Sequence, residues 1–304
     1  MSRQAINAVR AYLNEQVLGQ PELVDGLMTA LLADGHILVE GPPGLAKTRA
    51  IKMLANCIER RFHRIQFTPD LLPADLTGTD IYRPQDGSFV FQPGPLFHHL
   101  LLADEINRAP AKVQSALLEA MAEHQVTIDG TTRPLPAPFF VIATQNPVAL
   151  SGTYPLPDPQ LDRFLLRLSM GYPSADAERA LLTGEDRRAL IAQAKPLLDE
   201  AEVLSLQQAV SNVHASEALI GYVQALLARS RQHPGVRIGL SPRAGLALLR
   251  AARAHALLLG RGHALPEDVQ ALFLPLAAHR LVGDGDAGDG AQLAKSVLLA
   301  VPVD

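Results

Sequence analysis

The chain has 304 residues, of which 48% are hydrophobic and 19% are charged, and its formal net charge is −4. This apolar fraction is typical of a globular protein and excludes disorder over most of the chain. No apolar run approaches the ~20 residues that a membrane span needs. The negative charge and the lack of a Lys/Arg block disfavour a dedicated nucleic-acid binder. At about 100–200 residues per domain, the length predicts about two domains.

The first half of the sequence alternates short apolar runs with helical patterns. Five runs are typical of buried strands, and they cover residues 36–40, 64–67, 100–103, 139–144 and 164–168. Continuous apolar runs separated by helices indicate a parallel sheet that is covered on both faces. We therefore expect a five-stranded parallel sheet in an α/β domain.

Two further stretches in this half have the pattern of β-hairpins. Residues 82–91 centre on the pair Asp86-Gly87, and residues 125–132 centre on Asp129-Gly130. Asp-Gly between strand-forming residues is a good short-range signal for a hairpin. We expect two hairpins to project from the core, one before and one after the third strand of the sheet.

The second half is predominantly helical. After Tyr172 the strand signals stop, and helical patterns cover residues 215–231, 242–259 and 266–281. Ser241-Pro242 predicts a helix start, because serine caps the free N–H groups and proline suits the first helical position. We expect two domains, an α/β domain over residues 1–171 and a helical domain over residues 172–304.

A Gly/Pro-rich loop follows the first predicted strand and opens a helix. It consists of Gly41, Pro42, Pro43, Gly44, Leu45, Ala46, Lys47 and Thr48. This is the layout of a P-loop, in which backbone N–H groups surround phosphate oxygens, Lys47 reaches the terminal phosphates and Thr48 ligates Mg²⁺. Ala46 stands where the pattern has its second glycine, so we expect a negative φ there. We include Arg49 in the nucleotide-binding set, and a simple strand-to-helix turn is the alternative interpretation.

Two carboxylates and an amide follow later strands of the predicted sheet. Asp104 and Glu105 end the third strand, and Asn146 comes just after the fourth. Ligands of open parallel sheets bind beyond the carboxyl ends of the strands, so these side chains can converge on one γ-phosphate. Asp104 is expected to hold Mg²⁺ through water, opposite Thr48, and Glu105 is the expected general base that polarises the attacking water. Asn146 is suited to orient that water or, alternatively, to form a turn before Pro147.

These residues resemble the AAA+ ATPase superfamily and, within it, the MoxR family. Four passages carry the resemblance: 17–20, 41–48, 104–109 and 142–147. The resemblance extends over nearly the whole chain. It includes Ala46, because MoxR sequences also look like this at the second glycine position of the P-loop. It implies an α/β fold with a P-loop AAA+ core, a five-stranded parallel sheet, two β-hairpin inserts and a C-terminal helical lid domain.

The resemblance also implies roles for individual residues. Gly19 and Gln20 look like the segment that contacts the adenine, and Asn146 matches the sensor 1 position. Arg163 lies in a passage resembling that of the arginine finger, with Arg108 and Arg167 as alternatives. Arg243 resembles the sensor 2 arginine at the start of a lid helix. Arginine suits these roles because its planar guanidinium stays charged and binds phosphate through two donors.

The resemblance implies a hexameric ring that hydrolyses ATP with Mg²⁺ and remodels, matures or activates a protein client. Members of the family often act with a partner bearing a von Willebrand factor type A domain. The alternatives are the motor subunit of a metal-insertion complex of the chelatase type, a nucleic-acid motor or loader of the same superfamily, and a nucleotide-gated scaffold. A scaffold has no need for Glu105, and a duplex binder usually needs a basic face.

The single cysteine, Cys57, bears on the compartment. It cannot form an internal disulfide, and it lies in a predicted amphipathic helix, where free cysteine behaves as a small buried hydrophobe. The first residues lack the charged and then apolar order of a signal peptide. These observations predict a cytoplasmic protein, because free thiols are typical of a reducing compartment.

Overall fold

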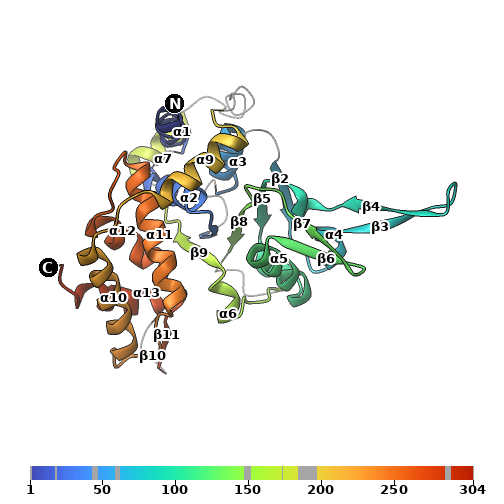
Figure 1. Ribbon diagram of the computed structural model, residues 1–304. Helices are drawn as coiled ribbons and strands as arrows, with labels where there is room; N and C mark the ends of the chain where they lie inside the picture. The colour runs from blue at the N-terminus through green and yellow to red at the C-terminus, as the bar shows by residue number, and fades with distance from the viewer. Residues whose placement is uncertain are drawn as a thin grey trace. The chain divides into compact units, whose positions relative to one another are not determined.

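The computed structural model describes residues 2–17, 19–42, 47–58, 62–146, 152–172, 174–183, 197–284 and 289–303. Its central feature is a five-stranded sheet with the order β2-β5-β8-β1-β9, as expected from the apolar runs (Figure 1). The strands are β1 (His36–Glu40), β2 (Phe62–Gln66), β5 (Leu100–Asp104), β8 (Phe140–Gln145) and β9 (Phe164–Ser169). Each predicted strand is thus confirmed within two residues at its ends.

Burial explains why these segments form strands. Every residue of β1 and of β5 is buried, so both faces of these strands are covered. In β2, by contrast, Arg64 and Gln66 are exposed while Ile65 between them is buried. β2 is an edge strand, and it pairs in parallel with β5 so that Arg64 lies opposite Leu102 and Gln66 lies opposite Asp104. Two polar side chains of one strand face therefore lie beside the end of β5.

Before residue 184, helices precede, connect and follow the strands. They are α1 (Ser2–Gln16), α2 (Pro21–Leu32), α3 (Lys47–Cys57), α4 (Pro73–Thr77), α5 (Ala111–Glu123), α6 (Asp158–Leu161) and α7 (Ala175–Thr183), with the 3₁₀ turns η1 (Pro95–Phe97) and η2 (Ile106–Arg108).

Cys57 ends α3 and is buried, and burial raises the pKa of its thiol to about 12. The thiol is therefore protonated and unreactive at neutral pH.

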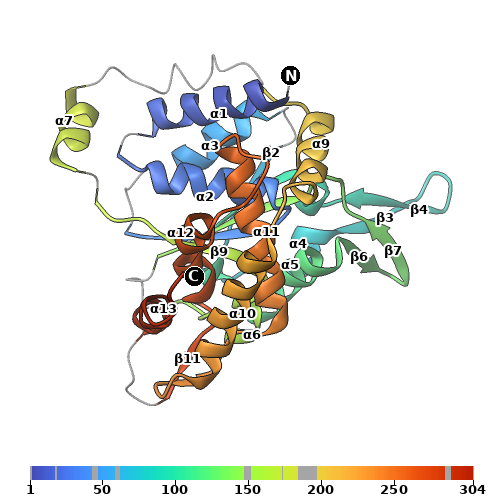
Figure 2. The same ribbon diagram turned by 60° about the vertical axis from the view of Figure 1, so that its left-hand side comes forward.

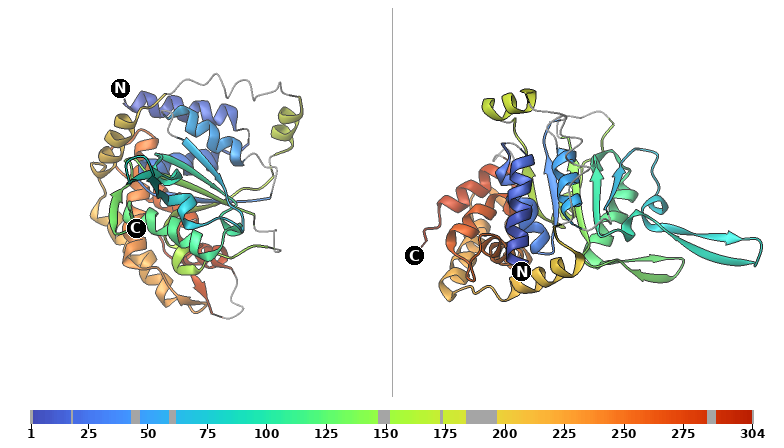
Figure 3. Two further views of the ribbon diagram at one scale, coloured as in Figure 1. Left: turned by 90° about the vertical axis from the view of Figure 1, so that its right-hand side faces the viewer. Right: turned by 90° about the horizontal axis from the view of Figure 1, so that it is seen from above.

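Both predicted hairpins are present. β3 (Gly78–Arg83) pairs with β4 (Ser88–Pro93), and β6 (Gln125–Ile128) pairs with β7 (Thr131–Pro134), both antiparallel. Figure 1 and the right-hand view of Figure 3 show the two hairpins leaving the α/β core in the same direction.

One side chain joins the two hairpins. The guanidinium of Arg133 in β7 lies 3.9 Å from the ring centre of Phe91 in β4. It also lies 3.6 Å from the carboxylate of Asp80 in β3. Arg133 therefore ties the two hairpins together through a cation–π contact and an ion pair.

Contacts divide the chain into two compact units. One comprises residues 38–163 and 169–200, and the other comprises residues 1–37, 164–168 and 201–304. This grouping assigns the N-terminal helices to the same unit as the C-terminal helices, whereas the predicted division falls at residues 171 and 172. The domains 1–171 and 172–304 therefore remain a prediction.

The C-terminal helices follow the predicted pattern, with two corrections. They are α9 (Glu200–Ser211), α10 (Glu217–Gln232), α11 (Pro242–Leu258), α12 (Pro266–Ala277) and α13 (Gly290–Leu299), which Figure 2 shows. Ser241 caps α11 by accepting a hydrogen bond from the N–H of Ala244, as predicted. The expectation that strands stop after Tyr172 is wrong, because β10 (Val236–Ile238) pairs with β11 (Val282–Gly283). α12 also ends at Ala277 and not at Leu281.

A buried ion cluster fixes the turn between α11 and α12. The carboxylate of Asp268 is fully buried and accepts hydrogen bonds from Arg261 Nη2 at 2.5 Å and Arg261 Nη1 at 2.8 Å. His255 Nδ1 and the N–H of Leu265 also lie at 2.7 and 2.8 Å from this carboxylate. Burial raises the pKa of Asp268, but the bonds from His255, Arg261 and Leu265 outweigh it and lower the pKa to about 2. The Asp268 carboxylate is therefore ionised at neutral pH.

Candidate nucleotide-binding and catalytic site

The predicted carboxylates lie where two neighbouring strands end. β5 and β8 pair in parallel with Ala103 opposite Ala143, so Asp104 and Thr144 follow side by side. Both strands are buried, and Asp104 is 8% exposed and Thr144 1% exposed. The sheet therefore fixes the backbone of the two residues beside each other.

Asp104 accepts hydrogen bonds through both carboxylate oxygens. Thr144 Oγ1 donates to Oδ1 at 2.5 Å, and Arg64 donates to Oδ2 through Nη2 at 2.6 Å and Nε at 3.1 Å. Hydrogen bonds in which one partner is ionised are about twice as strong as neutral ones. The carboxylate is thus held on one side by a buried hydroxyl and on the other by a cation.

Glu105 adopts an unusual backbone conformation directly after β5. Its φ of 58° and ψ of 50° lie in the left-handed region, which costs a non-glycine residue about 1 kcal/mol or more. Its N–H donates to Thr144 Oγ1 at 3.0 Å, which helps to hold this conformation. The Thr144 hydroxyl therefore bridges the two acidic residues, since it donates to Asp104 and accepts from Glu105.

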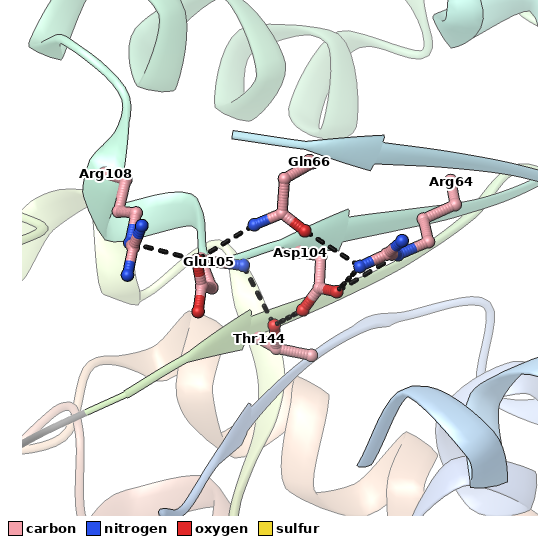
Figure 4. A network of polar contacts seen from close by, with 6 residues as sticks. All are labelled: Arg64, Gln66, Asp104, Glu105, Arg108 and Thr144. Atoms are coloured by element: carbon pink, nitrogen blue, oxygen red, sulfur yellow. Dashed lines mark hydrogen bonds and ion pairs between the residues drawn. The ribbon is translucent and has the colours of Figure 1, made fainter. Parts of the chain in front are cut away.

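The side chain of Glu105 completes a closed polar network, which Figure 4 shows. Gln66 Nε2 donates to Glu105 Oε2 at 2.9 Å, and Arg64 Nη2 donates to Gln66 Oε1 at 2.8 Å. Arg108 Nε lies 2.9 Å from the same Glu105 oxygen. The edge strand β2 thus contacts both acidic residues at the end of β5, one through Arg64 and one through Gln66.

Three members of this network were not predicted as site residues: Arg64, Gln66 and Thr144. The signal for two of them was present, because Arg64 and Gln66 alternate with the apolar Ile65 and so share one strand face. Recognising their importance also required the strand order, which places β2 beside β5. Thr144 lies in passage 142–147, which carries the family resemblance, but its hydroxyl has no role that this pattern predicts.

The phosphate loop is described at its two ends only. β1 ends at Glu40, and the backbone of α3 begins at Lys47, so Lys47, Thr48 and Arg49 form the first turn of a helix. Pro43, Gly44, Leu45 and Ala46 lie outside the described residues, as do the side chains of Lys47, Thr48 and Arg49. The expected φ of Ala46 and the predicted contacts of Lys47 and Thr48 therefore stay predictions.

Close packing explains the first glycine of this loop. A Cβ atom at Gly41 would lie 2.8 Å from the carbonyl oxygen of Met170, so no larger residue fits without a shift of the backbone. The N–H of Met170 donates to the carbonyl of Glu40 at 2.7 Å. Glu40 also accepts a hydrogen bond from Gln145 Nε2, which connects the end of β1 to the end of β8. Asn146, the predicted sensor, comes directly after this contact.

The predicted arginines have different surroundings. Arg163 lies between α6 and β9, and its Nη1 donates to the carbonyl of Leu118 in α5 at 2.9 Å. Arg108 pairs with Glu105 of its own chain, as described above. Arg167 lies in β9, and Arg243 is the second residue of α11. Among the four predicted arginines, Arg108 is the one whose described contacts include the acidic pair, which Arg64 also contacts.

The predicted adenine segment forms the junction of the first two helices. Gly19 lies between α1 and α2 with a φ of 73°, a conformation that favours glycine. Gln20 directly precedes α2. An ion pair between Arg10 and Asp25, with atoms 2.6 Å apart, joins the same two helices. The adenine contact itself stays a prediction.

Two family models match this chain. The model described as the ATPase family associated with various cellular activities (AAA) matches residues 36–166, and the model of the AAA lid domain matches residues 228–296. The first stretch lies within the predicted α/β domain, and the second lies within the predicted helical lid. The fold is therefore the α/β fold of an AAA+ ATPase with its lid.

Relatives extend the match over most of the chain. Chaperone MoxR1 of Mycobacterium tuberculosis is 44% identical over 281 residues, which cover 89% of this chain and 74% of the relative. The uncharacterized protein YeaC of Bacillus subtilis is 45% identical, with 89% and 85% covered. A crystal structure of a Cytophaga hutchinsonii protein assigned as an ATPase has a TM-score of 0.88 and 38% identity, and the alignment covers 100% of this chain and 96% of that one. The chain belongs to the MoxR family of AAA+ ATPases.

Proposed function

We propose that this protein is a Mg²⁺-dependent ATPase that works as a ring, expected to be a hexamer, and uses hydrolysis to remodel, mature or activate a partner protein. The observation that carries the proposal is the placement of Asp104 and Glu105 at the end of β5, where the Thr144 hydroxyl contacts both residues. This geometry gives one buried carboxylate and one more exposed carboxylate at the edge where parallel sheets bind nucleotides.

The residues fit a nucleotide with its metal ion. Mg²⁺ is usually bound by one or two carboxylates together with phosphates and waters, so Asp104 with the Thr48 hydroxyl is an adequate protein contribution. The ion supplies neutralisation of the charge on the β- and γ-phosphate oxygens. Lys47 at the start of α3 is the expected cation for the terminal phosphates, next to the N–H groups of the helix N-terminus.

Glu105 is assigned the role of general base. Its contacts with Gln66 and Arg108 both go to Oε2, so we assign Oε1 to accept the proton of the attacking water. Asn146 is assigned to orient that water, because it follows β8 directly and its neighbour Gln145 is held by Glu40. A positioned base of this kind contributes about 10²–10⁴ in rate.

Arg163 is assigned the role of a finger that reaches the nucleotide of a neighbouring subunit. Arg108, the alternative, contacts Glu105 within its own chain, which leaves it less suited to act across an interface. Arg163 contacts only a backbone carbonyl among its described hydrogen bonds, so its charge is not neutralised there by a carboxylate. Arg167 remains the second alternative, and Arg243 is assigned the sensor 2 role from the lid.

The role of the protein toward its client rests on its relatives. One relative is named a chaperone, and the exposed aromatic residues Tyr82 and Phe89 of the β3–β4 hairpin suit contact with a protein. A von Willebrand factor type A partner and a cytoplasmic location belong to the same proposal.

Within the described ranges, no helix has the length and apolar character that crossing a bilayer requires. A motor subunit of a chelatase-type complex is the alternative, and a role on nucleic acid is disfavoured by the net charge of −4.

Mixing two inactive variants tests the ring ATPase. Glu105→Gln and Arg163→Ala should each lose Mg²⁺-dependent ATP hydrolysis, while the control Arg83→Ala at a hairpin tip should keep it. A mixed ring contains interfaces at which an intact Glu105 meets an intact Arg163, so mixing at concentrations that allow subunit exchange should recover activity. Arginine fingers are worth about 10³–10⁵ in rate in other phosphoryl-transfer systems. Full hydrolysis by Arg163→Ala alone, or by a verified monomer, would contradict the assignment of this finger.

A further inference from the structure

Arg64 holds one of the two carboxylate oxygens of Asp104. Its guanidinium places two donors on Asp104 Oδ2, at 2.6 and 3.1 Å. The other oxygen, Oδ1, is held by Thr144, whose hydroxyl is itself fixed because it accepts the N–H of Glu105. Oδ1 thus has an immobile partner, and Oδ2 has a partner on a long, flexible side chain.

Exposure indicates which partner can leave. The side chain of Arg64 is 41% exposed, whereas that of Asp104 is 11% exposed. Arg64 also lies on the edge strand β2, so its guanidinium can turn toward solvent without disturbing the sheet. Of the two described partners of Asp104, Arg64 is therefore the one that can leave if a cation is to bind this carboxylate.

We propose that Arg64 is an internal counter-cation of Asp104, which neutralises this carboxylate in the nucleotide-free chain and must leave before Mg²⁺ binds with nucleotide. The proposal rests on the proposed function, because it takes Asp104 to be the metal ligand. Arg64 is then a positioning residue that raises the Mg²⁺ concentration the protein requires. Without it, the incoming ion would meet a more negative potential around Asp104.

The opposite role makes the opposite prediction. If Arg64 supported Asp104 in the metal-bound state, its removal would weaken Mg²⁺ binding. If Arg64 contacted a phosphate, its removal would weaken nucleotide binding even without metal. Competition alone predicts tighter Mg²⁺ binding and an unchanged metal-free affinity for nucleotide.

A fluorescence titration with the non-hydrolysable ATP analogue mant-AMP-PNP separates these cases. Affinity is measured in EDTA and then as a function of Mg²⁺ for the wild type, Arg64→Gln and Arg64→Lys. Arg83→Gln is the matched control, because it removes one positive charge from an exposed position on the β3–β4 hairpin. Thermal melting of each variant confirms that it is folded.

In Arg64→Gln, the Mg²⁺ concentration at half-effect should fall by about threefold to tenfold, which corresponds to about 0.6–1.4 kcal/mol at tenfold per 1.4 kcal/mol. Arg64→Lys keeps the charge but replaces the two-nitrogen contact with a single nitrogen, so its decrease should be smaller. It carries the test if Arg64→Gln is unfolded. Affinity in EDTA should not change in either variant, and Arg83→Gln should match the wild type.

Three results would overturn the inference: a half-effect concentration that is unchanged or higher, a loss of affinity in EDTA, or an equal decrease in Arg83→Gln. They are distinguishable from a failure of the proposed function. If the wild type shows no Mg²⁺-dependent nucleotide binding, the proposed function fails. If the wild type shows it and Arg64→Gln behaves the same, only the role of Arg64 fails.

Discussion

Replacing Thr144 with valine removes the hydroxyl that bridges the two acidic residues while leaving a side chain of nearly the same shape. Thr144 Oγ1 donates to Asp104 Oδ1 at 2.5 Å and accepts the N–H of Glu105 at 3.0 Å. Thr144 is 1% exposed, so bulk water cannot readily replace the hydroxyl. We expect the variant to lose both the orientation of Asp104 and the support for the left-handed backbone of Glu105.

The magnitude follows from the two bonds. A hydrogen bond to a charged group contributes about 1.5–3 kcal/mol, and a buried N–H that loses its acceptor costs about 1–3 kcal/mol. Because Arg64 still holds the other oxygen of Asp104, part of this loss is relieved, and we expect about 2–4 kcal/mol less stability. A displacement of the acidic pair that raises the reaction barrier by about 1.4–2.8 kcal/mol would lower ATP turnover tenfold to hundredfold.

The assay measures steady-state ATP hydrolysis and urea denaturation for Thr144→Val, Thr144→Ser and Thr127→Val. Thr144→Ser keeps the hydroxyl and should recover most of the turnover. Thr127→Val is the matched control, because Thr127 lies exposed in β6, where its hydroxyl contacts that of Thr132 at 3.0 Å. Turnover and stability of Thr144→Val that equal those of Thr127→Val would refute the reasoning.

Two further predictions concern the phosphate loop and the lid. Lys47→Ala should weaken ATP binding itself, because the ammonium group is expected to face the phosphates in the ground state. An unchanged affinity for ATP, measured by titration, would mean that residues 41–48 are not the phosphate site. Asp268 has its pKa lowered from 3.8 to about 2, so it contributes roughly 2 kcal/mol of stability above about pH 4, and this contribution is lost as the pH falls toward 2. Asp268→Asn should therefore lower the free energy of unfolding at pH 7 by a similar amount, as measured by urea denaturation. Between pH 4 and pH 2 the variant should lose less stability than the wild type. A variant as stable as the wild type at pH 7 would contradict this prediction.

Local sequence signals predicted most of the fold. Strands such as Leu100–Asp104 are apolar on both faces, and each hairpin carries an Asp-Gly pair, so both could be recognised without knowledge of distant residues. The pair β10 and β11 was missed because Val236–Ile238 is short and meets a partner far along the chain at Val282–Gly283. The end of α12 was misplaced because the helical pattern continues into a turn, in which the N–H of Arg280 bonds to the carbonyl of Ala277, three residues earlier.

In the candidate site, too, local sequence signals could be recognised, whereas contacts between distant residues could not. Asp104 and Glu105 could be predicted because they follow an apolar strand after a phosphate-loop motif. The roles of Arg64 and Gln66 could not, because they depend on which strand pairs with β5 and in what register. Thr144 belongs to a recognisable motif, but its bridging contact with both acidic residues is a property of the folded sheet.

The central claim is that Glu105 is the base of an ATP-hydrolysing site in which Asp104 is the expected metal ligand. Single-turnover hydrolysis of bound, radiolabelled ATP by Glu105→Gln tests it most directly, with Glu123→Gln at the exposed end of α5 as the control. We predict that Glu105→Gln binds Mg·ATP with the affinity of the wild type and hydrolyses it about 10²–10⁴ times more slowly, while Glu123→Gln hydrolyses it normally. Hydrolysis by Glu105→Gln at a rate near that of Glu123→Gln would contradict the account.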